Sequence, residues 1–198
     1  MSVPAYLRAT SREDLSQWVV HLVRVQDGYT ALMGILDGGG GIAPSIVHSI
    51  TRYHLQGAAC FYDCPPSLWS RIVETNPNGR CPFGLIVQKR ALWYLGGRPA
   101  IYTDLDNPDV WPPAERFRVI RTDLTRDPMP VDWMHEREWR MPNGLGLQRN
   151  LGYCWWWPLV PDSYHAAMVF DRYANVGAIY QMDRCQIVER QRMVVHCG

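Results

Sequence analysis

The segment 132–142 holds the residues of this chain best suited to chemistry, a Glu136-Arg137-Glu138 triplet in what reads as a β-strand. Side chains alternate between the faces of a strand, so Glu136, Glu138 and Arg140 are expected to share one face. Two carboxylates at this spacing can hold a sugar hydroxyl or stabilise a cationic sugar centre, and their repulsion favours a ligand between them. The alternative is a solvated edge strand with a ladder of ion pairs, because Arg137 locally neutralises the two acids.

The cysteines favour thiols over disulfides or metal. Six are present, at positions 60, 64, 81, 154, 185 and 197. The first residues lack a basic segment followed by an apolar run, so no secretion signal is expected and reduced thiols are favoured. Cys60, Cys64 and Cys81 have poor spacing for zinc, and no second tight pair of Cys or His closes the set, so we expect no metal site.

The elements that must position these residues follow from periodicity and turn signals. We expect helices at 29–36, 67–74 and 89–95, and strands at 17–24, 58–62, 83–88, 99–103, 135–141, 153–160, 165–170 and 186–196. Residues 104–131 carry five prolines and are expected to form a long, partly helical excursion over the surface. The glycine run 38–41 follows a helix and lacks a subsequent Lys-Ser/Thr, so it is not a phosphate loop. The pattern predicts a single α+β domain over 1–198, rich in strands.

Composition sets limits on the class of protein. The chain has 198 residues, is 47% hydrophobic and 20% charged, and carries a net charge of +1. This balance is typical of a globular domain and argues against nonspecific coating of nucleic acid. The sequence has no apolar run of about 18 residues, so we expect a cytoplasmic protein without a membrane segment. Lys89 is the only lysine, and the many arginines are suited to bidentate phosphate binding.

Short motifs in a fixed order, spanning about 19–142, carry a resemblance to a known family. The pieces are His21-Leu22-Val23-Arg24, Gly34-Ile35-Leu36-Asp37-Gly38, Cys60-Phe61-Tyr62-Asp63-Cys64-Pro65, Phe83-Gly84-Leu85-Ile86-Val87, Gly97-Arg98-Pro99-Ala100-Ile101-Tyr102 and Glu136-Arg137-Glu138-Trp139-Arg140. In order and spacing they resemble bacterial ADP-ribosyltransferase-like domains of toxin–antitoxin and abortive-infection systems, of which the DarT toxins are examples. The resemblance implies split β-sheets around an NAD cleft, with His21 and Glu138 on facing strands.

The resemblance also implies roles for single residues. Glu138 would stabilise the ribose cation and hold its 2′-hydroxyl, while Glu136 would orient the acceptor or support Glu138. His21 and Arg24 would hold the adenosine ribose or a phosphate, and Tyr62 would stack on nicotinamide. The alternatives are structural, namely a core histidine at position 21, a core tyrosine at position 62 and an ion pair from Arg24 to Asp27.

The function implied by the resemblance is mono-ADP-ribosyl transfer from NAD to a nucleic acid or protein acceptor, in a toxin or phage-conflict effector. An antitoxin or immunity protein would then be a partner. Two alternatives remain open from the sequence. One is an NAD glycohydrolase on the same fold, and the other is an inactive module that binds a nucleotide or a partner protein.

Overall fold

A large mixed sheet dominates the structure, a computed structural model that describes residues 16–37, 41–43, 57–75, 79–105, 107, 110–125, 130, 132, 134–147 and 155–190. The strand order is β10-β9-β8-β3-β1-β2-β7-β4, and all neighbours are antiparallel except β8 and β9. The strands are β1 (Trp18–Leu22), β2 (Ala58–Tyr62), β3 (Gly84–Gln88), β4 (Arg98–Pro99), β7 (Glu138–Pro142), β8 (Trp156–Val160), β9 (Ala178–Gln181) and β10 (Gln186–Glu189). The protein is therefore α+β, as expected from the sequence.

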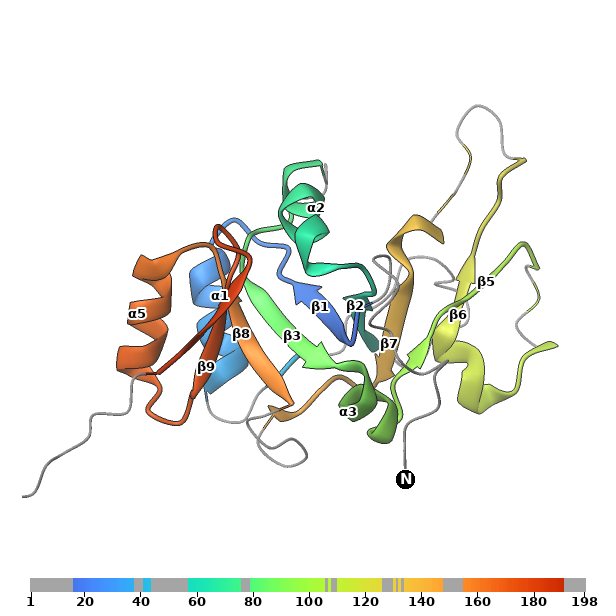
Figure 1. The fold of residues 1–198 in the computed structure, drawn as a ribbon. Helices are drawn as coiled ribbons and strands as arrows, with labels where there is room; N and C mark the ends of the chain where they lie inside the picture. Colours follow the sequence, from blue (N-terminus) through green and yellow to red (C-terminus); the bar gives the residue numbers. More distant parts are fainter. Residues whose placement is uncertain are drawn as a thin grey trace, which may run out of the picture.

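Short helices and a second small sheet complete the fold (Figure 1). The α-helices are α1 (Gly28–Leu36), α2 (Trp69–Thr75), α3 (Lys89–Tyr94) and α5 (Ser163–Arg172), and the 3₁₀ helices are η5 (Pro66–Leu68), η7 (Pro113–Arg118) and η8 (Met134–Glu136). The strands β5 (Ile101–Thr103) and β6 (Val119–Arg121) form a parallel pair. None of the helices in the described part of the chain has the length and apolar character needed to cross a membrane.

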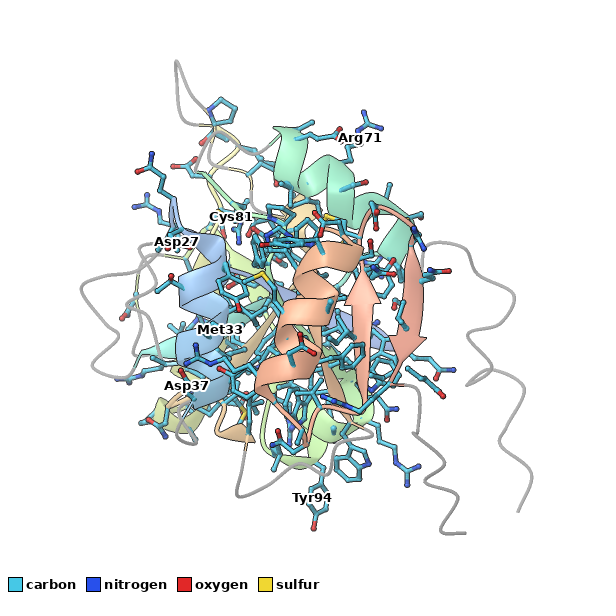
Figure 2. All side chains as sticks on the ribbon, turned by 90° about the vertical axis from the view of Figure 1, so that its left-hand side faces the viewer. Asp27, Met33, Asp37, Arg71, Cys81 and Tyr94 are labelled. Carbon is cyan, nitrogen blue, oxygen red and sulfur yellow. The ribbon has the colours of Figure 1, made fainter. Side chains whose placement is uncertain are left out.

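Alternation along the central strands creates two hydrophobic cores. Val19 and Phe61 belong to the core that also contains residues of α1, α3 and α5, whereas Val20 and Ile86 belong to the core formed with α2. Figure 2 shows α1 and α5 side by side on one side of the molecule. Each strand residue thus faces one of two covered layers, which is why the central strands read as nearly continuous apolar runs.

An aspartate lies at each end of α1. The Asp27 carboxylate accepts from the backbone N–H of Thr30 at 2.9 Å at the start of α1. At the other end of α1, the Asp37 carboxylate accepts from Arg172 and from the hydroxyl of Tyr173, both at 2.7 Å. Asp27 and Asp37 lie at opposite ends of α1 in Figure 2, so the two caps fix both the length of α1 and its contact with α5.

Several expected elements differ in the structure. The expected strand at 165–170 lies in α5, because Asp162 caps a helix there and the buried residues, Ala166 and Val169, are three positions apart. The strand β9 was not expected from the sequence. The expected strand at 99–103 is divided at Ala100, whose N–H donates to the carbonyl of Glu138, so its halves belong to different sheets. The glycine run 38–40, the expected turn at 76–78 and the outer ends of the strands at 153–160 and 186–196 lie outside the described residues.

The expected position of His21 and Glu138, on facing strands of split sheets, differs from the one in the structure. His21 and Glu138 lie in the same eight-stranded sheet, on β1 and β7, with β2 between them. Within the described residues, however, β1 meets β2 through the single register pair Val20–Tyr62, whereas β1 and β3 align over their whole length. The ladder is therefore interrupted between β1 and β2.

Candidate functional site

The two carboxylates of the Glu-x-Glu pair come from different elements. Glu136 ends η8 and Glu138 begins β7, so the expected strand at 135–141 starts three residues late. Between them Arg137 adopts a φ of 45°, in the left-handed region that non-glycine residues rarely occupy. The relative orientation of the two carboxylates is therefore set by this turn, and not by the alternation of side chains along a strand.

Glu138 forms a buried ion pair with Arg140. The Nε and Nη2 atoms of Arg140 donate to the two carboxylate oxygens at 3.2 and 3.4 Å. Glu138 is 7% exposed and Arg140 is 1% exposed. The Nη1 atom of Arg140 donates to the carbonyls of Phe117 and Val119, both at 3.2 Å. The guanidinium therefore fixes the Glu138 carboxylate and attaches β7 to the η7–β6 segment.

Tyr102 lies against the same acid. Its hydroxyl oxygen accepts from the backbone N–H of Glu138 at 2.7 Å. Burial raises the pKa of Tyr102 to about 12, and the nearby charges of Glu138 and Glu136 act in the same direction. Tyr102 consequently stays protonated at neutral pH, with its O–H available to donate.

Cys60 places a thiol beside Glu138. It is the register partner of Arg140 on β2, and its thiol donates to the carbonyl of Ala58 at 3.9 Å. Burial, together with the charge of Glu138, raises the pKa of Cys60 far above the ordinary value. A protonated thiol is a poor nucleophile, so Cys60 is part of the packing around the acid and not a reactive group.

Glu136 is held by Tyr62 and Arg80. The Tyr62 hydroxyl donates to Oε1 of Glu136 at 3.2 Å, and Nη2 of Arg80 lies 3.5 Å from the same oxygen. The Arg80 guanidinium also stacks over the Tyr62 ring, 4.1 Å from its centroid. Tyr62 is 5% exposed. In this arrangement Tyr62 is no open platform for nicotinamide, and its hydroxyl serves to orient Glu136.

His21 bridges the interrupted part of the sheet. Its Nδ1 lies 2.8 Å from the carbonyl oxygen of Cys60, and since a carbonyl only accepts, Nδ1–H is the donor. Burial lowers the pKa of His21 to about 4, and the charges of Arg80 and Arg24 lower it further against the opposing effect of the Cys60 hydrogen bond. His21 is therefore neutral at pH 7, and its Nε2 is left as an acceptor.

Arg24 is exposed, and its positive charge helps to lower the pKa of Arg80. Val23 donates its N–H to the carbonyl of Phe83 and accepts from the N–H of Cys81, both at 3.0 Å. These bonds attach the end of β1 to the segment before β3. The expected alternative, an ion pair from Arg24 to Asp27, is not needed to satisfy Asp27, whose carboxylate binds Thr30.

Of the five residues singled out in the sequence, Tyr62, Glu136 and Glu138 lie together on β2, η8 and β7, and the charge of Arg24 reaches Arg80 beside them. His21 follows Val20 and lies on the opposite face of β1, with its ring centroid 5.8 Å from that of Phe61. Tyr62 is the register partner of both Val20 and Glu138, so the three side chains form one row across the three strands. Sequence reasoning missed Arg80 and Tyr102. Arg80 lies outside both expected strands, 17–24 and 83–88, and Tyr102 was part of a motif but had no assigned role.

The described cysteines Cys60, Cys64, Cys81 and Cys185 are free. Across the part of the chain that the structure describes, no three side chains of the His, Cys, Asp or Glu type are grouped as metal ligands.

Comparisons of the chain with protein-family models, with curated proteins and with solved structures produced no match. The physical arrangement of the site and the motif resemblance are therefore the grounds for any functional assignment.

Proposed function

We propose that the protein is an NAD-dependent mono-ADP-ribosyltransferase that transfers ADP-ribose to a nucleic acid or protein acceptor. The observation that carries the proposal is the pair of separately held carboxylates, with Glu138 fixed by Arg140 and Glu136 fixed by Tyr62. Arg80 lies beside Glu136, the charge of Arg24 acts on Arg80, and the neutral His21 binds the backbone of the neighbouring strand β2. Such a set can bind a sugar and a phosphate and can stabilise a developing cation.

The reaction needs an oxocarbenium-like transition state, as in glycoside hydrolysis. The bond between C1′ of the ribose and the nicotinamide nitrogen breaks, and its electron pair leaves with nicotinamide, which becomes neutral. Glu138 stabilises the positive charge that develops on the ribose. The acceptor then forms a bond to C1′, and its proton passes to Glu136.

The remaining residues bind different groups of the substrate. The unprotonated Nε2 of His21 is suited to accept from a ribose hydroxyl, and it is unsuited to phosphate, which needs a donor. Arg24 provides donors for phosphate oxygens. The Arg140 guanidinium compensates the negative charge of the Glu138 carboxylate in spite of its burial.

Two alternative functions share parts of this site. In an NAD glycohydrolase, water replaces the macromolecular acceptor. The other alternative is a module that binds a nucleotide or a partner protein without turnover, in which the burial of Glu138 and its two contacts with Arg140 serve packing alone.

Incubation of the protein with NAD labelled on the adenosine side, with and without cell lysate, separates the three functions. Transfer gives a labelled macromolecule, and hydrolysis gives free ADP-ribose. Unchanged NAD in both samples would overturn the proposal in favour of the binding module. A transferase acting as a toxin is also expected to have an antitoxin or immunity protein as a partner, which co-expression rescue of growth would detect.

A further inference from the structure

The ring of Tyr62 is covered by the side chain of Arg80. The guanidinium lies over the ring, with its carbon 4.1 Å from the ring centroid, which is the geometry of a cation–π contact. Tyr62 is 5% exposed and Arg80 is 8% exposed, so the ring and the cation over it are shielded together from solvent. Because Tyr62 otherwise belongs to the core formed with α2, the guanidinium occupies the side of the ring that a planar ligand would use.

Few good contacts hold Arg80 in this position. Its Nη2 atom lies 3.5 Å from Oε1 of Glu136, which is long for a buried ion pair. Its Nε atom is buried and, among the described residues, has no hydrogen-bond partner. A buried donor without an acceptor raises the free energy of this arrangement. Movement of the guanidinium into water would satisfy these donors, so a ligand that displaces it loses little.

The buried position is also unfavourable for the charge of Arg80. Burial lowers the pKa of Arg80 to about 10, and the charge of Arg24 acts in the same direction, against the opposing effects of Glu136 and Glu138. Release of the guanidinium into water restores its hydration and removes this desolvation cost. Geometry and charge therefore both describe a contact that a competing cation can replace.

We propose that Arg80 is an autoinhibitory plug, which must leave the Tyr62 ring before a planar cationic ligand can stack there. The inference rests on the proposed function for the identity of that ligand, the nicotinamide ring of NAD. This ring is a planar pyridinium cation, so it suits the same aromatic face beside the Glu136 carboxylate as the planar guanidinium does. The two cations compete for one position, and the fraction of molecules with Arg80 displaced limits the apparent affinity for NAD.

The test is a fluorescence titration of the full chain with 1-methylnicotinamide, a pyridinium cation without ribose or phosphate. Arg80→Ala should strengthen its binding by about threefold to tenfold, because the ligand no longer displaces a cation–π contact. Arg71→Ala, which removes an exposed arginine on α2 that points outward in Figure 2, should leave the affinity unchanged.

A second substitution separates stacking from a simple change of charge. In a Tyr62→Leu background the aromatic face is absent, so Arg80→Ala should give no gain in affinity for 1-methylnicotinamide. A gain that persists without the ring would be an effect of charge alone and would overturn the inference.

Arg80→Lys serves if Arg80→Ala does not fold. It keeps the charge beside Glu136 but replaces the planar group by an ammonium, which is more strongly hydrated and should leave the ring more readily. Binding of 1-methylnicotinamide should then be tighter than in the native sequence, by a smaller factor than in Arg80→Ala. Unchanged or weaker binding in the folded Arg80 variants would overturn the inference.

The kinetics of NAD cleavage distinguish failure of the plug from failure of the proposed function. A plug predicts a lower KM for NAD in Arg80→Ala, whereas the loss of a phosphate ligand predicts a higher KM, which would overturn the inference. Ring-dependent tightening of 1-methylnicotinamide binding without NAD cleavage by any variant supports the plug and counts against the transferase. NAD cleavage with the same KM in Arg80→Ala and the native sequence overturns the plug and leaves the transferase standing.

Discussion

The ion pair of Arg140 and Glu138 contributes to the folded structure as well as to the proposed chemistry. The ion pair is almost fully removed from water, and Arg140 also binds two backbone carbonyls of the η7–β6 segment. Removal of one member of such a pair leaves the other charge buried and uncompensated. A loss of activity at position 138 must therefore be separated from a loss of stability.

Asp63 offers a matched comparison for that separation. It is 7% exposed, its Oδ1 lies 2.6 Å from Nζ of Lys89, and its Oδ2 accepts from the indole of Trp139. We expect Glu138→Gln and Asp63→Asn each to lower the free energy of unfolding by about 3 kcal/mol, since each breaks a buried ion pair. Urea denaturation at pH 7 measures both values. No loss for Glu138→Gln would show that the Arg140 contact is not formed in solution.

His21 should make the stability depend on pH. Its pKa is about 4 in the folded protein and about 6.5 when unfolded, so the unfolded chain binds more protons between these pH values. The contribution of His21 to the free energy of unfolding is therefore fully present above pH 6.5. It falls by about 2–3 kcal/mol as the pH falls toward 4. In His21→Asn the amide can still donate to Cys60, but the group no longer titrates. Between pH 7 and pH 5, the denaturation midpoint should fall less in His21→Asn than in the native sequence. An equal fall of the midpoint in both proteins would contradict the role of His21.

At the scale of elements, the turn between η8 and β7 decides how the carboxylates face the site. Arg137 has a left-handed backbone at φ 45°, which costs a non-glycine residue about 1 kcal/mol or more. Strain of this kind next to two candidate functional residues is consistent with a conformation imposed by its surroundings.

Arg137→Gly should raise the free energy of unfolding by about 0.5–1 kcal/mol, because glycine adopts this backbone without a steric penalty. Asn143, with φ 62°, provides the control, since asparagine tolerates the left-handed region better than arginine. We expect a smaller gain for Asn143→Gly in thermal unfolding. Destabilisation by Arg137→Gly would mean that contacts of the arginine side chain outweigh the backbone strain.

The β1–β3 pairing depends on a close backbone approach at Gly84. A Cβ atom at this position would lie 1.8 Å from the carbonyl oxygen of His21, which belongs to the backbone and cannot rotate away. Gly84→Ala should destabilise the protein by about 3 kcal/mol through overpacking. Gly34→Ala, on α1 with open space around the added Cβ, should instead stabilise the helix by about 0.5–1 kcal/mol. Similar Tm values for both variants would argue against the pairing of Gly84 with Leu22 that sets the register of β1 and β3.

Local patterns predicted the elements best where local forces dominate. The expected strand at 58–62 and the helix at 29–36 match β2 and α1, because strand composition and a capping aspartate act over a few residues. The segment 165–170 was misassigned because its apolar residues fit either period over so short a run. The break before Glu138 depends on a left-handed residue that no glycine or asparagine signals.

At the scale of the whole molecule, the pairing of strands distant in the chain could not be predicted from the sequence. Motif order indicated that His21, Tyr62 and Glu138 belong to one site, but it could not place β1, β2 and β7 as neighbours in a single sheet. It also could not identify Arg80, because its contact with Glu136 depends on the packing of a loop against the distant helix η8. The strand order of the sheet and the contacts of the site therefore became visible only in the tertiary structure. An ADP-ribosyltransferase fold stays a prediction.

The most direct test of the central claim is the rate of nicotinamide release from NAD by the native sequence, Glu138→Gln and Asp63→Asn, each measured where the protein is folded. If Glu138 stabilises the ribose cation, Glu138→Gln should lower kcat by about 10²–10³, with little change in NAD affinity. Asp63→Asn, although similarly destabilised, should keep kcat close to that of the native sequence. Full turnover in folded Glu138→Gln, or an equal loss of kcat in both variants, would contradict a catalytic role for Glu138.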